Sequence, residues 1–345
     1  MNTQMKQRST SESLTTGRER IMRRKHIFGP VQSHRLGRSL GIDLIPYKTC
    51  SYNCVYCECG ETTIQTIERS IIIPENEVME ELRSTLSTSP QLDSVTFAGS
   101  GEPTLSLSLG NVIAMVKEEF PQYIISVLTN GSLLTRSDVR EELMRADRVI
   151  PTLTSARQET FERIHRPHPS LSIDAIIAGM EEFRREYRGG IWLEIFIIPG
   201  VNTSEEELIS LRDAITRINP DRVQLNTLDR PAPESWVQAA SEAELNMVRE
   251  ILGREKVEIV NLSPSAPKSG TVPGEEKEMI SAMLSRRPST IEDIITATGM
   301  SGGEVAKILR DLENAGEIRS YRGTRGTFYS SSLPDEGDPK EEENH

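Results

Sequence analysis

Hydrophobic and polar positions change their period repeatedly along residues 40–252, and the pattern predicts strands that alternate with helices. Short apolar runs typical of buried strands occupy residues 40–45, 94–99, 123–131, 147–154, 191–200 and 221–228. Segments with the apolar spacing of amphipathic helices occupy residues 73–86, 109–120, 137–146, 172–187, 204–218 and 241–252. Six strands, each followed by a helix, imply right-handed crossovers and a parallel sheet. We therefore expect an α/β fold whose sheet either curls into an incomplete barrel or lies open.

Four loops with strong turn signals follow strands of this predicted sheet. They lie at residues 50–60, 99–103, 129–131 and 199–202. In both forms of the sheet, ligands bind at the carboxyl ends of the strands. Because all four loops fall at such ends, we expect the functional site to lie there.

The composition changes towards the C-terminus, which indicates a second, smaller domain. Residues 263–274 are rich in Ser, Pro and Gly, as in a linker. Residues 275–332 then show three helical segments and two alternating strands, in the order of a winged helix-turn-helix. We expect residues 26–262 to form the larger domain, with a basic flexible arm at 1–25 and an acidic tail at 333–345.

The charge and hydrophobicity of the chain narrow the class of protein. The formal net charge is −12, which argues against broad, non-specific nucleic-acid binding but leaves a local basic face open. No apolar run approaches the roughly 20 residues needed to span a bilayer. The first 25 residues are polar and basic and have no apolar core of a secretion signal. We therefore expect a cytoplasmic protein with no membrane partner.

All four cysteines lie within residues 50–59, and thiols placed so closely have few uses. Disulfides are disfavoured in a reducing cytosol, and a disulfide that closes a very short loop removes little chain entropy from the unfolded state. Structural zinc usually takes two separated C-x2-C pairs or added histidines, whereas this loop has one pair, Cys54 and Cys57, and no histidine. Cysteine thiolates also hold iron–sulfur clusters. Three thiolates, from Cys50, Cys54 and Cys57, would leave one iron of a [4Fe–4S] cluster without a protein ligand. Cys59 follows Cys57 too closely, and we expect it not to be a ligand.

The spacing C-x3-C-x-aromatic-C, with Tyr56 as the aromatic residue, resembles the signature of the radical S-adenosylmethionine (SAM) superfamily. The resemblance implies a partial (β/α)6 TIM-like barrel with a [4Fe–4S] cluster bound by Cys50, Cys54 and Cys57. It also implies reductive cleavage of SAM to a 5′-deoxyadenosyl radical, which abstracts a hydrogen atom from a substrate. A low-potential ferredoxin or flavodoxin is expected as the electron donor.

Three further loops resemble the SAM-binding segments of the superfamily. The stretch "SGEP" is similar to its "GGEP" loop, which binds the amino end of SAM, and an α-ammonium group needs acceptors such as the Glu102 carboxylate. The stretch "LTNG" is similar to a loop beside SAM, and a hydroxyl on the fourth strand can contact the ribose. The residues so assigned to SAM are Tyr56, Gly99, Ser100, Gly101, Glu102, Pro103, Thr129, Asn130 and Thr152.

Several polar residues near the same edge are candidates for catalysis or substrate binding. Glu194 stands alone in an apolar strand, and a buried charge is costly unless it is paired. We expect Glu194 either to face the barrel interior near ribose or substrate, or to pair with an arginine. Asn226, Asp229 and Arg230 follow the sixth strand and are further candidates. His165 and His168, in a predicted loop, are either proton carriers or loop fillers and complete the set.

A narrower resemblance covers most of residues 26–260, to a bacterial and archaeal group related to wyosine-type tRNA synthases. It rests on "FGPVQSHRLGRSLGIDLIPYKTCSYNCVYC", "FAGSGEPTL", "HRPHP" and "VQLNTLDRP". One possible substrate is RNA or a nucleotide, whose phosphates would be contacted by Arg319, Arg322 and Arg325 of the predicted wing. The other is a protein or peptide, which the winged helix would dock. The alternative is a DNA-binding regulator in which the cluster senses redox state or SAM.

Overall fold

The computed structural model describes residues 26–260, 276–323 and 325–331. The predicted basic arm at 1–25, the linker at 263–274 and the acidic tail at 333–345 lie outside the described residues. Within the described part, no helix is long and apolar enough to cross a membrane.

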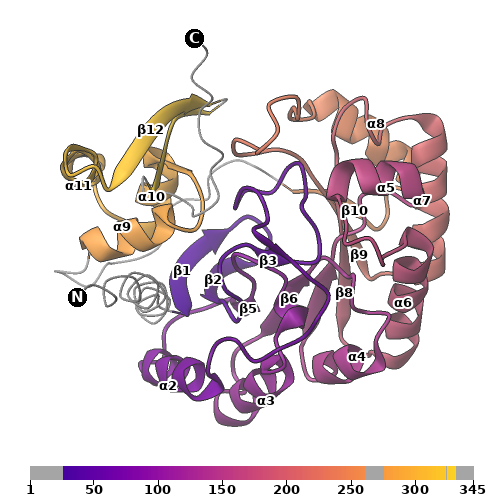
Figure 1. The fold of residues 1–345 in the computed structure, drawn as a ribbon, viewed down its shortest axis with the longest axis horizontal. Helices are drawn as coiled ribbons and strands as arrows, with labels where there is room; N and C mark the ends of the chain where they lie inside the picture. Colours follow the sequence, from indigo (N-terminus) through magenta and orange to yellow (C-terminus); the bar gives the residue numbers. More distant parts are fainter. Residues whose placement is uncertain (1–25, 261–275, 324, 332–345) are drawn as a thin grey trace, which may run out of the picture.

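One eight-stranded sheet forms the centre of the larger part of the molecule, and its strands follow chain order (Figure 1). The strands are β1 (Ile27–Ser33), β2 (Gly37–Ile42), β5 (Ser94–Phe97), β6 (Ile125–Thr129), β7 (Arg148–Pro151), β8 (Gly190–Phe196), β9 (Arg222–Asn226) and β10 (Val257–Ile259). Neighbouring strands from β2 to β10 are parallel, and β1 alone pairs antiparallel, with β2. The predicted α/β fold with a parallel sheet is confirmed.

The helices cover the outside of this sheet, as Figure 1 shows. They are α2 (Glu75–Leu86), α3 (Leu109–Glu119), α4 (Ser137–Leu143), α5 (Gln158–His165), α6 (Ile173–Glu186), α7 (Glu205–Ile218) and α8 (Glu242–Leu252). Their apolar faces and the strands form one continuous buried core. Ser172, Ser204 and Ser241 accept hydrogen bonds at the first turns of α6, α7 and α8, which fixes where these helices begin.

The structure corrects the predicted elements at three places. The first parallel strand, β2, ends at Ile42, before the predicted end at residue 45. The antiparallel strand β1 was not predicted, because Gly29 and Pro30 interrupt its apolar pattern where the β1–β2 register shifts. A seventh parallel strand, β10, has only three residues, too few for a periodic signal. Helix α5 occupies a segment predicted to be a loop, so His165 ends a helix.

A separate group of elements follows, which we call the C-terminal unit (residues 276–323 and 325–331). It contains α9 (Glu276–Leu284), β11 (Ser289–Thr290), α10 (Ile291–Thr298), α11 (Gly302–Asn314), β12 (Ile318–Gly323) and β13 (Gly326–Ser331). Its three strands form an antiparallel sheet in the order β11-β13-β12. It has its own apolar core around Ile280, Ile294 and Leu309. The unit lies beside β1 in Figure 1, and α10 contacts that strand.

Candidate active site at the cysteine loop

The carboxyl ends of the parallel strands surround a cavity of about 480 Å³. Most of the residues predicted from the sequence line it, although they come from six separate segments. The predicted residues in its lining are Cys50, Tyr56, Cys57, Gly99, Gly101, Glu102, Thr129, Asn130, Thr152, Glu194, Asn226, Asp229 and Arg230. The predicted residues outside this lining are Cys54, Ser100, Pro103, His165, His168, Arg319 and Arg322. The sheet therefore brings the predicted residues together at the edge where they were expected.

The cysteine loop is held in place by backbone contacts with the end of helix α5. The Val55 amide donates to the Ile164 carbonyl at 2.9 Å, and the Asn53 amide donates to the His165 carbonyl at 2.9 Å. The Tyr56 ring stacks on Phe196 of β8, with 3.9 Å between centroids. These contacts fix the loop against two elements that lie more than 100 residues further along the chain.

His165 lies directly against one of the predicted cluster ligands. Its Nδ1 atom is 3.1 Å from Cys54 Sγ, and its ring packs against Tyr52 and Phe161. Burial lowers the pKa of His165 to about 3, so the imidazole is neutral at physiological pH. His168 bonds Ser170 instead and is not among the cavity-lining residues. The contact between His165 and Cys54 could not be assigned from the sequence, in which only the "HRPHP" stretch drew attention to His165.

The four thiols have different surroundings. Burial raises the pKa of Cys50 to about 12, whereas a hydrogen bond from Cys59 lowers the pKa of Cys57. Cys59 Sγ also lies 3.8 Å from the Gly99 carbonyl oxygen. Cys59 therefore contacts Cys57 and the "SGEP" loop at the same time.

The donor set for the predicted cluster is three thiols on one loop. Among the described residues, no three His, Cys, Asp or Glu side chains come together closely enough to hold one ion. A cubane attaches each ligand sulfur to a different iron, so its ligands must surround a space and need not converge on a point. Cys50 and Cys57 line the cavity, and Cys54 is on the same loop. The three thiols therefore fit the predicted [4Fe–4S] cluster.

Glu102 joins the loops that follow β5 and β6. Its Oε1 atom accepts hydrogen bonds from Thr104 Oγ1 and Thr129 Oγ1, both at 2.6 Å. Its Oε2 atom accepts from the Asn130 amide at 2.7 Å. Burial raises the pKa of the Glu102 carboxyl, although these hydrogen bonds oppose the rise. The carboxylate is therefore held in one orientation at the cavity wall.

The glycines of this loop are required by close packing. A Cβ atom on Gly101 would lie 2.1 Å from the Thr49 carbonyl oxygen, and one on Gly99 would lie 2.3 Å from Asp43 Cγ. Ser100 donates from its hydroxyl to Asp43 at 3.0 Å, and Pro103 begins a short 3-10 helix. Ser100 and Pro103 therefore hold the loop in place, Gly99 leaves room for the Asp43 side chain, and Gly101 lets the loop approach the cysteine loop.

Asn130 links the third loop to the first cysteine. Its side-chain amide donates to Ser51 Oγ at 2.8 Å and lies 3.5 Å from Cys50 Sγ. The Ser51 hydroxyl in turn bonds the Ser132 hydroxyl at 2.7 Å. The predicted SAM-binding loops and the predicted cluster ligands thus form one connected set of contacts.

Glu194 lines the cavity and pairs with an arginine, as one of the two expectations had it, while its place near ribose or substrate stays a prediction. Its carboxylate lies 2.7 Å from Arg35 Nη1 and accepts hydrogen bonds from Thr152 and Asn226, each at 3.0 Å. Burial alone would raise the pKa of Glu194, but Arg35 and these two donors hold it below its ordinary value. Arg35 precedes β2, and nothing in the sequence pattern marked it as a site residue.

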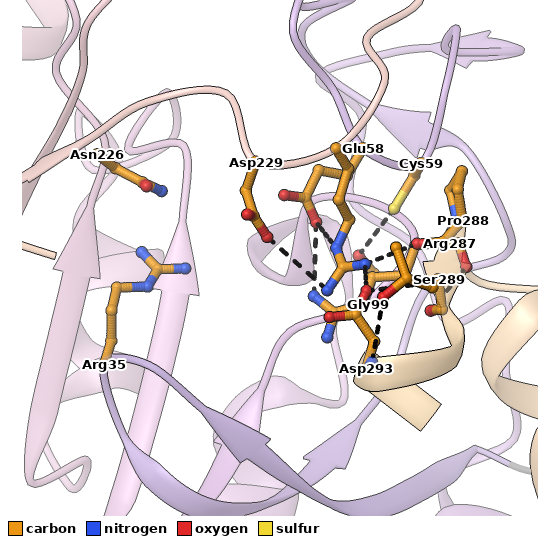
Figure 2. A network of polar contacts seen from close by, with 12 residues as sticks. Arg35, Glu58, Cys59, Gly99, Asn226, Asp229, Arg287, Pro288, Ser289 and Asp293 are labelled. Atoms are coloured by element: carbon orange, nitrogen blue, oxygen red, sulfur yellow. Dashed lines mark hydrogen bonds and ion pairs between the residues drawn. The ribbon is translucent and has the colours of Figure 1, made fainter. Parts of the chain in front are cut away.

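Asp229 and Arg230 contact the C-terminal unit as well as the cavity. Figure 2 shows Asp229 and Glu58 beside Asp293, Arg287 and Pro288 of that unit. Arg325, which was predicted to contact phosphates from the wing, pairs with Asp229 at 2.9 Å and with Asp293 at 3.0 Å. One of these carboxylates is buried and the other half-buried, so the Arg325 guanidinium faces the cavity edge, and its contact with phosphates stays a prediction.

Comparisons with known proteins agree with this arrangement. The family model for the radical SAM superfamily matches residues 44–212. A UPF0026 protein of Methanocaldococcus jannaschii is 34% identical over 314 residues, which cover 89% of this chain and 96% of that protein. A Brachyspira hyodysenteriae protein named GTPase Obg is 35% identical over 301 residues, 86% of this chain and 44% of that protein. The chain therefore spans less than half of the Brachyspira relative.

A solved structure shares the fold. The crystal structure of a radical SAM methyltransferase from Sphaerobacter thermophilus superposes with a TM-score of 0.50 and 18% sequence identity. The match covers 64% of this chain and 65% of that chain. At this identity the likeness concerns the fold alone.

Proposed function

The chain belongs to the radical SAM superfamily and, within it, to the UPF0026 proteins; from this premise we propose that it abstracts a hydrogen atom from a substrate still to be identified. It is an enzyme whose cofactors are a [4Fe–4S] cluster and SAM. When bound, these supply one electron and a cleavable carbon–sulfur bond, and so generate a 5′-deoxyadenosyl radical. The residues of the chain would bind and orient the cofactors and the substrate and shield the radical from water.

Each group of cavity residues then has a distinct task. Cys50, Cys54 and Cys57 would hold the cluster, and the "SGEP" loop would bind the amino end of SAM. The Glu102 carboxylate supports this loop, because its hydrogen bonds to Thr129 and Asn130 tie neighbouring strands together. Thr152 and Glu194 would contact ribose hydroxyls. Asn226, bonded to Glu194, is the candidate for contact with the substrate.

One observation carries the proposal. Cys50 and Cys57 line the same cavity as Gly101, Glu102 and Asn130. These residues come from three loops at the carboxyl ends of the sheet, where α/β proteins bind their ligands. A zinc-stabilised loop would not need a cavity of this kind beside the thiols.

Anaerobic reconstitution tests the proposal directly. The protein is loaded with iron and sulfide, reduced in the presence of SAM, and assayed for 5′-deoxyadenosine. Cys54→Ala is expected to lose the cluster absorption and the product, whereas Cys59→Ser keeps both and serves as the matched control. If Cys54→Ala cleaves SAM as well as the parent does, the proposed chemistry is wrong. Equal iron loss in both variants would refute the assignment of three ligands.

We further propose that the C-terminal unit is a winged helix, since three helices precede the β12–β13 hairpin in its element order. Its helix α11 exposes three carboxylates, Glu304, Asp311 and Glu313, against two cations, Lys307 and Arg310. Such a face has no excess of positive charge for phosphates. This supports an enzyme over a DNA-binding regulator. RNA or nucleotide and protein substrates remain the two classes proposed, with ferredoxin or flavodoxin as electron donor.

A further inference from the structure

The cavity has two walls, and the C-terminal unit forms one of them. The barrel contributes the cysteine loop and the ends of the strands. The residues that the C-terminal unit contributes are Met283, Arg286, Arg287, Ser289, Asp293, Thr296, Ala297 and Arg325. A unit that served only to bind a distant partner would have no need to line the space next to Cys57 and Cys59.

Ion pairs clamp this unit to the barrel beside the cavity. Arg230 Nη1 lies 2.6 Å from Asp293 Oδ2 and donates a hydrogen bond to the Pro288 carbonyl at 2.8 Å. Arg325 Nε pairs with Asp229 at 2.9 Å. The Arg230 and Asp229 side chains are only 5% and 8% exposed. Buried charges of this kind depend strongly on their partners, so these pairs favour the docked arrangement.

The clamp also reaches the cysteine loop itself. Glu58, between Cys57 and Cys59 in the sequence, lies 3.2 Å from Arg230 Nε and 3.4 Å from Arg287 Nη1. Figure 2 shows Glu58 and Cys59 facing Arg287 and Asp293. Docking of the C-terminal unit therefore sets the position of the loop that carries the predicted cluster ligand Cys57.

A second anchor joins the unit to strand β1. The Arg286 guanidinium stacks over the Phe28 ring of β1, 4.6 Å from its centroid, and both residues line the cavity. Two separate attachments hold a rigid body in one orientation better than a single attachment does. The unit is therefore attached to the larger part of the molecule at two places in the cavity lining.

We propose that the C-terminal unit is the substrate-side wall of the active site, and that the substrate is a small molecule enclosed between this wall and the cysteine loop. The cavity of about 480 Å³ must also hold the proposed cluster and SAM, so the space that remains for a substrate is that of a small molecule. The side chains of the unit that face the cavity then help to select the substrate. This statement about the substrate rests on the proposed function, and of the classes proposed there it keeps a nucleotide-sized substrate and drops intact RNA and protein.

Cysteine labelling of the full chain without iron or SAM tests the enclosure. Two neutral maleimides are compared, N-ethylmaleimide and a bulky polyethylene-glycol maleimide, and mass spectrometry gives the rates at Cys57 and Cys59. In the parent, the bulky reagent is expected to be slowed relative to the small one, with the urea-unfolded chain as reference. Asp293→Asn is expected to lower the ratio of the small-reagent rate to the bulky-reagent rate at least about tenfold. The reason is that loss of the ion pair with Arg230 favours separation of the C-terminal unit from the cysteine loop.

Two further variants make the outcome specific. Asp293 and Glu304 occupy the same position in the capping boxes of α10 and α11, so Glu304→Gln weakens a helix cap in this unit without touching the clamp. Arg325→Gln removes a clamp contact and leaves the residues of both capping boxes in place. Discrimination lost in Asp293→Asn and Arg325→Gln but kept in Glu304→Gln supports the proposal. Equal labelling of the parent by both reagents, or no change in either clamp variant, overturns it.

The assay is independent of the proposed chemistry. A chain that bound no cluster, or that left SAM intact, would still show the labelling pattern if the wall exists. Conversely, if the chain cleaves SAM but the bulky reagent labels Cys57 and Cys59 freely, the proposed function stands and the proposal of an enclosed small substrate is refuted. The two failures are therefore distinguishable.

Discussion

The imidazole of His165 contacts the thiol of Cys54, with 3.1 Å between Nδ1 and Sγ. Helix α5 ends at His165, and the backbone of the cysteine loop bonds the carbonyls of Ile164 and His165. The pair therefore joins the predicted cluster loop to a helix that contributes no residue to the cavity lining. A neutral imidazole at this place can donate a hydrogen bond to the Cys54 thiolate.

His165→Phe is expected to lower the reduction potential of the reconstituted protein while leaving its iron content unchanged. Hydrogen bonds to ligand sulfurs stabilise the more negative, reduced state, and phenylalanine cannot donate one. The ring itself is tolerated because the neighbours of His165 are Tyr52, Tyr56 and Phe161. Potentiometric titration followed by optical or EPR spectra measures the shift.

His168→Phe is the matched control for this change. His168 follows by three residues, and its ring bonds Ser170 and contacts no cysteine. Its replacement should leave the potential at the parent value. A His165→Phe protein with an unaltered potential would show that the contact with Cys54 has no electronic role.

Gly101→Ala is expected to reduce SAM affinity at least about tenfold and to destabilise the fold by about 1–3 kcal/mol. The added Cβ would lie 2.1 Å from the Thr49 carbonyl, so the "SGEP" loop must move away from the cysteine loop. Isothermal calorimetry and urea unfolding measure the two effects. Gly303→Ala in α11 meets no atom within 4 Å and should instead stabilise the chain slightly. Unchanged SAM affinity in Gly101→Ala would mean that this loop does not bind SAM.

Glu102→Gln is expected to cost about 1.5–3 kcal/mol of unfolding free energy, since hydrogen bonds to a charged acceptor are replaced by weaker ones. The new amide must also place its NH2 group against Thr129 or the Asn130 amide, which are both donors. Urea denaturation gives the change. Glu119→Gln removes an exposed carboxylate paired with Arg83 and should cost less than about 1 kcal/mol. Equal costs at the two positions would contradict the bridging role of Glu102.

The sequence was sufficient for features that depend on local order. The spacing of Cys50, Cys54 and Cys57 and the apolar runs of the strands are contained in short windows, and the predicted loops meet at one edge because parallel strands share their direction. Helix α5 was missed because it is only eight residues long and lies between turn signals. Strand β1 was missed because Gly29 and Pro30 interrupt its pattern.

Contacts across long sequence separations could not be predicted in the same way. Arg230 and Asp293 are 63 residues apart, and Arg35 and Glu194 are 159 residues apart. No periodic signal links such residues, because docking of whole elements brings them together. The sequence therefore placed Arg325 on the predicted wing but could not show that docking of the C-terminal unit turns it towards Asp229.

Arg35→Met is expected to reverse the pH dependence of stability that comes from Glu194. In the parent, the pKa of Glu194 lies below its ordinary value, so its stabilising contribution is present above about pH 4.5 and is lost as the pH falls through the folded-state pKa. Without Arg35, burial becomes the dominant influence and raises the pKa above the ordinary value. The variant then favours the neutral carboxyl and loses stability as the pH rises through these values.

Urea unfolding between pH 5 and 8 measures this reversal. Across this range, the contribution of Glu194 in the parent should be nearly constant, whereas Arg35→Met should lose about 3 kcal/mol by pH 7, because its buried carboxylate has lost its cation. The double variant Arg35→Met with Glu194→Gln removes the carboxylate as well and should abolish the slope. If Arg35→Met follows the parent at every pH, the ion pair at the cavity wall does not control the charge of Glu194.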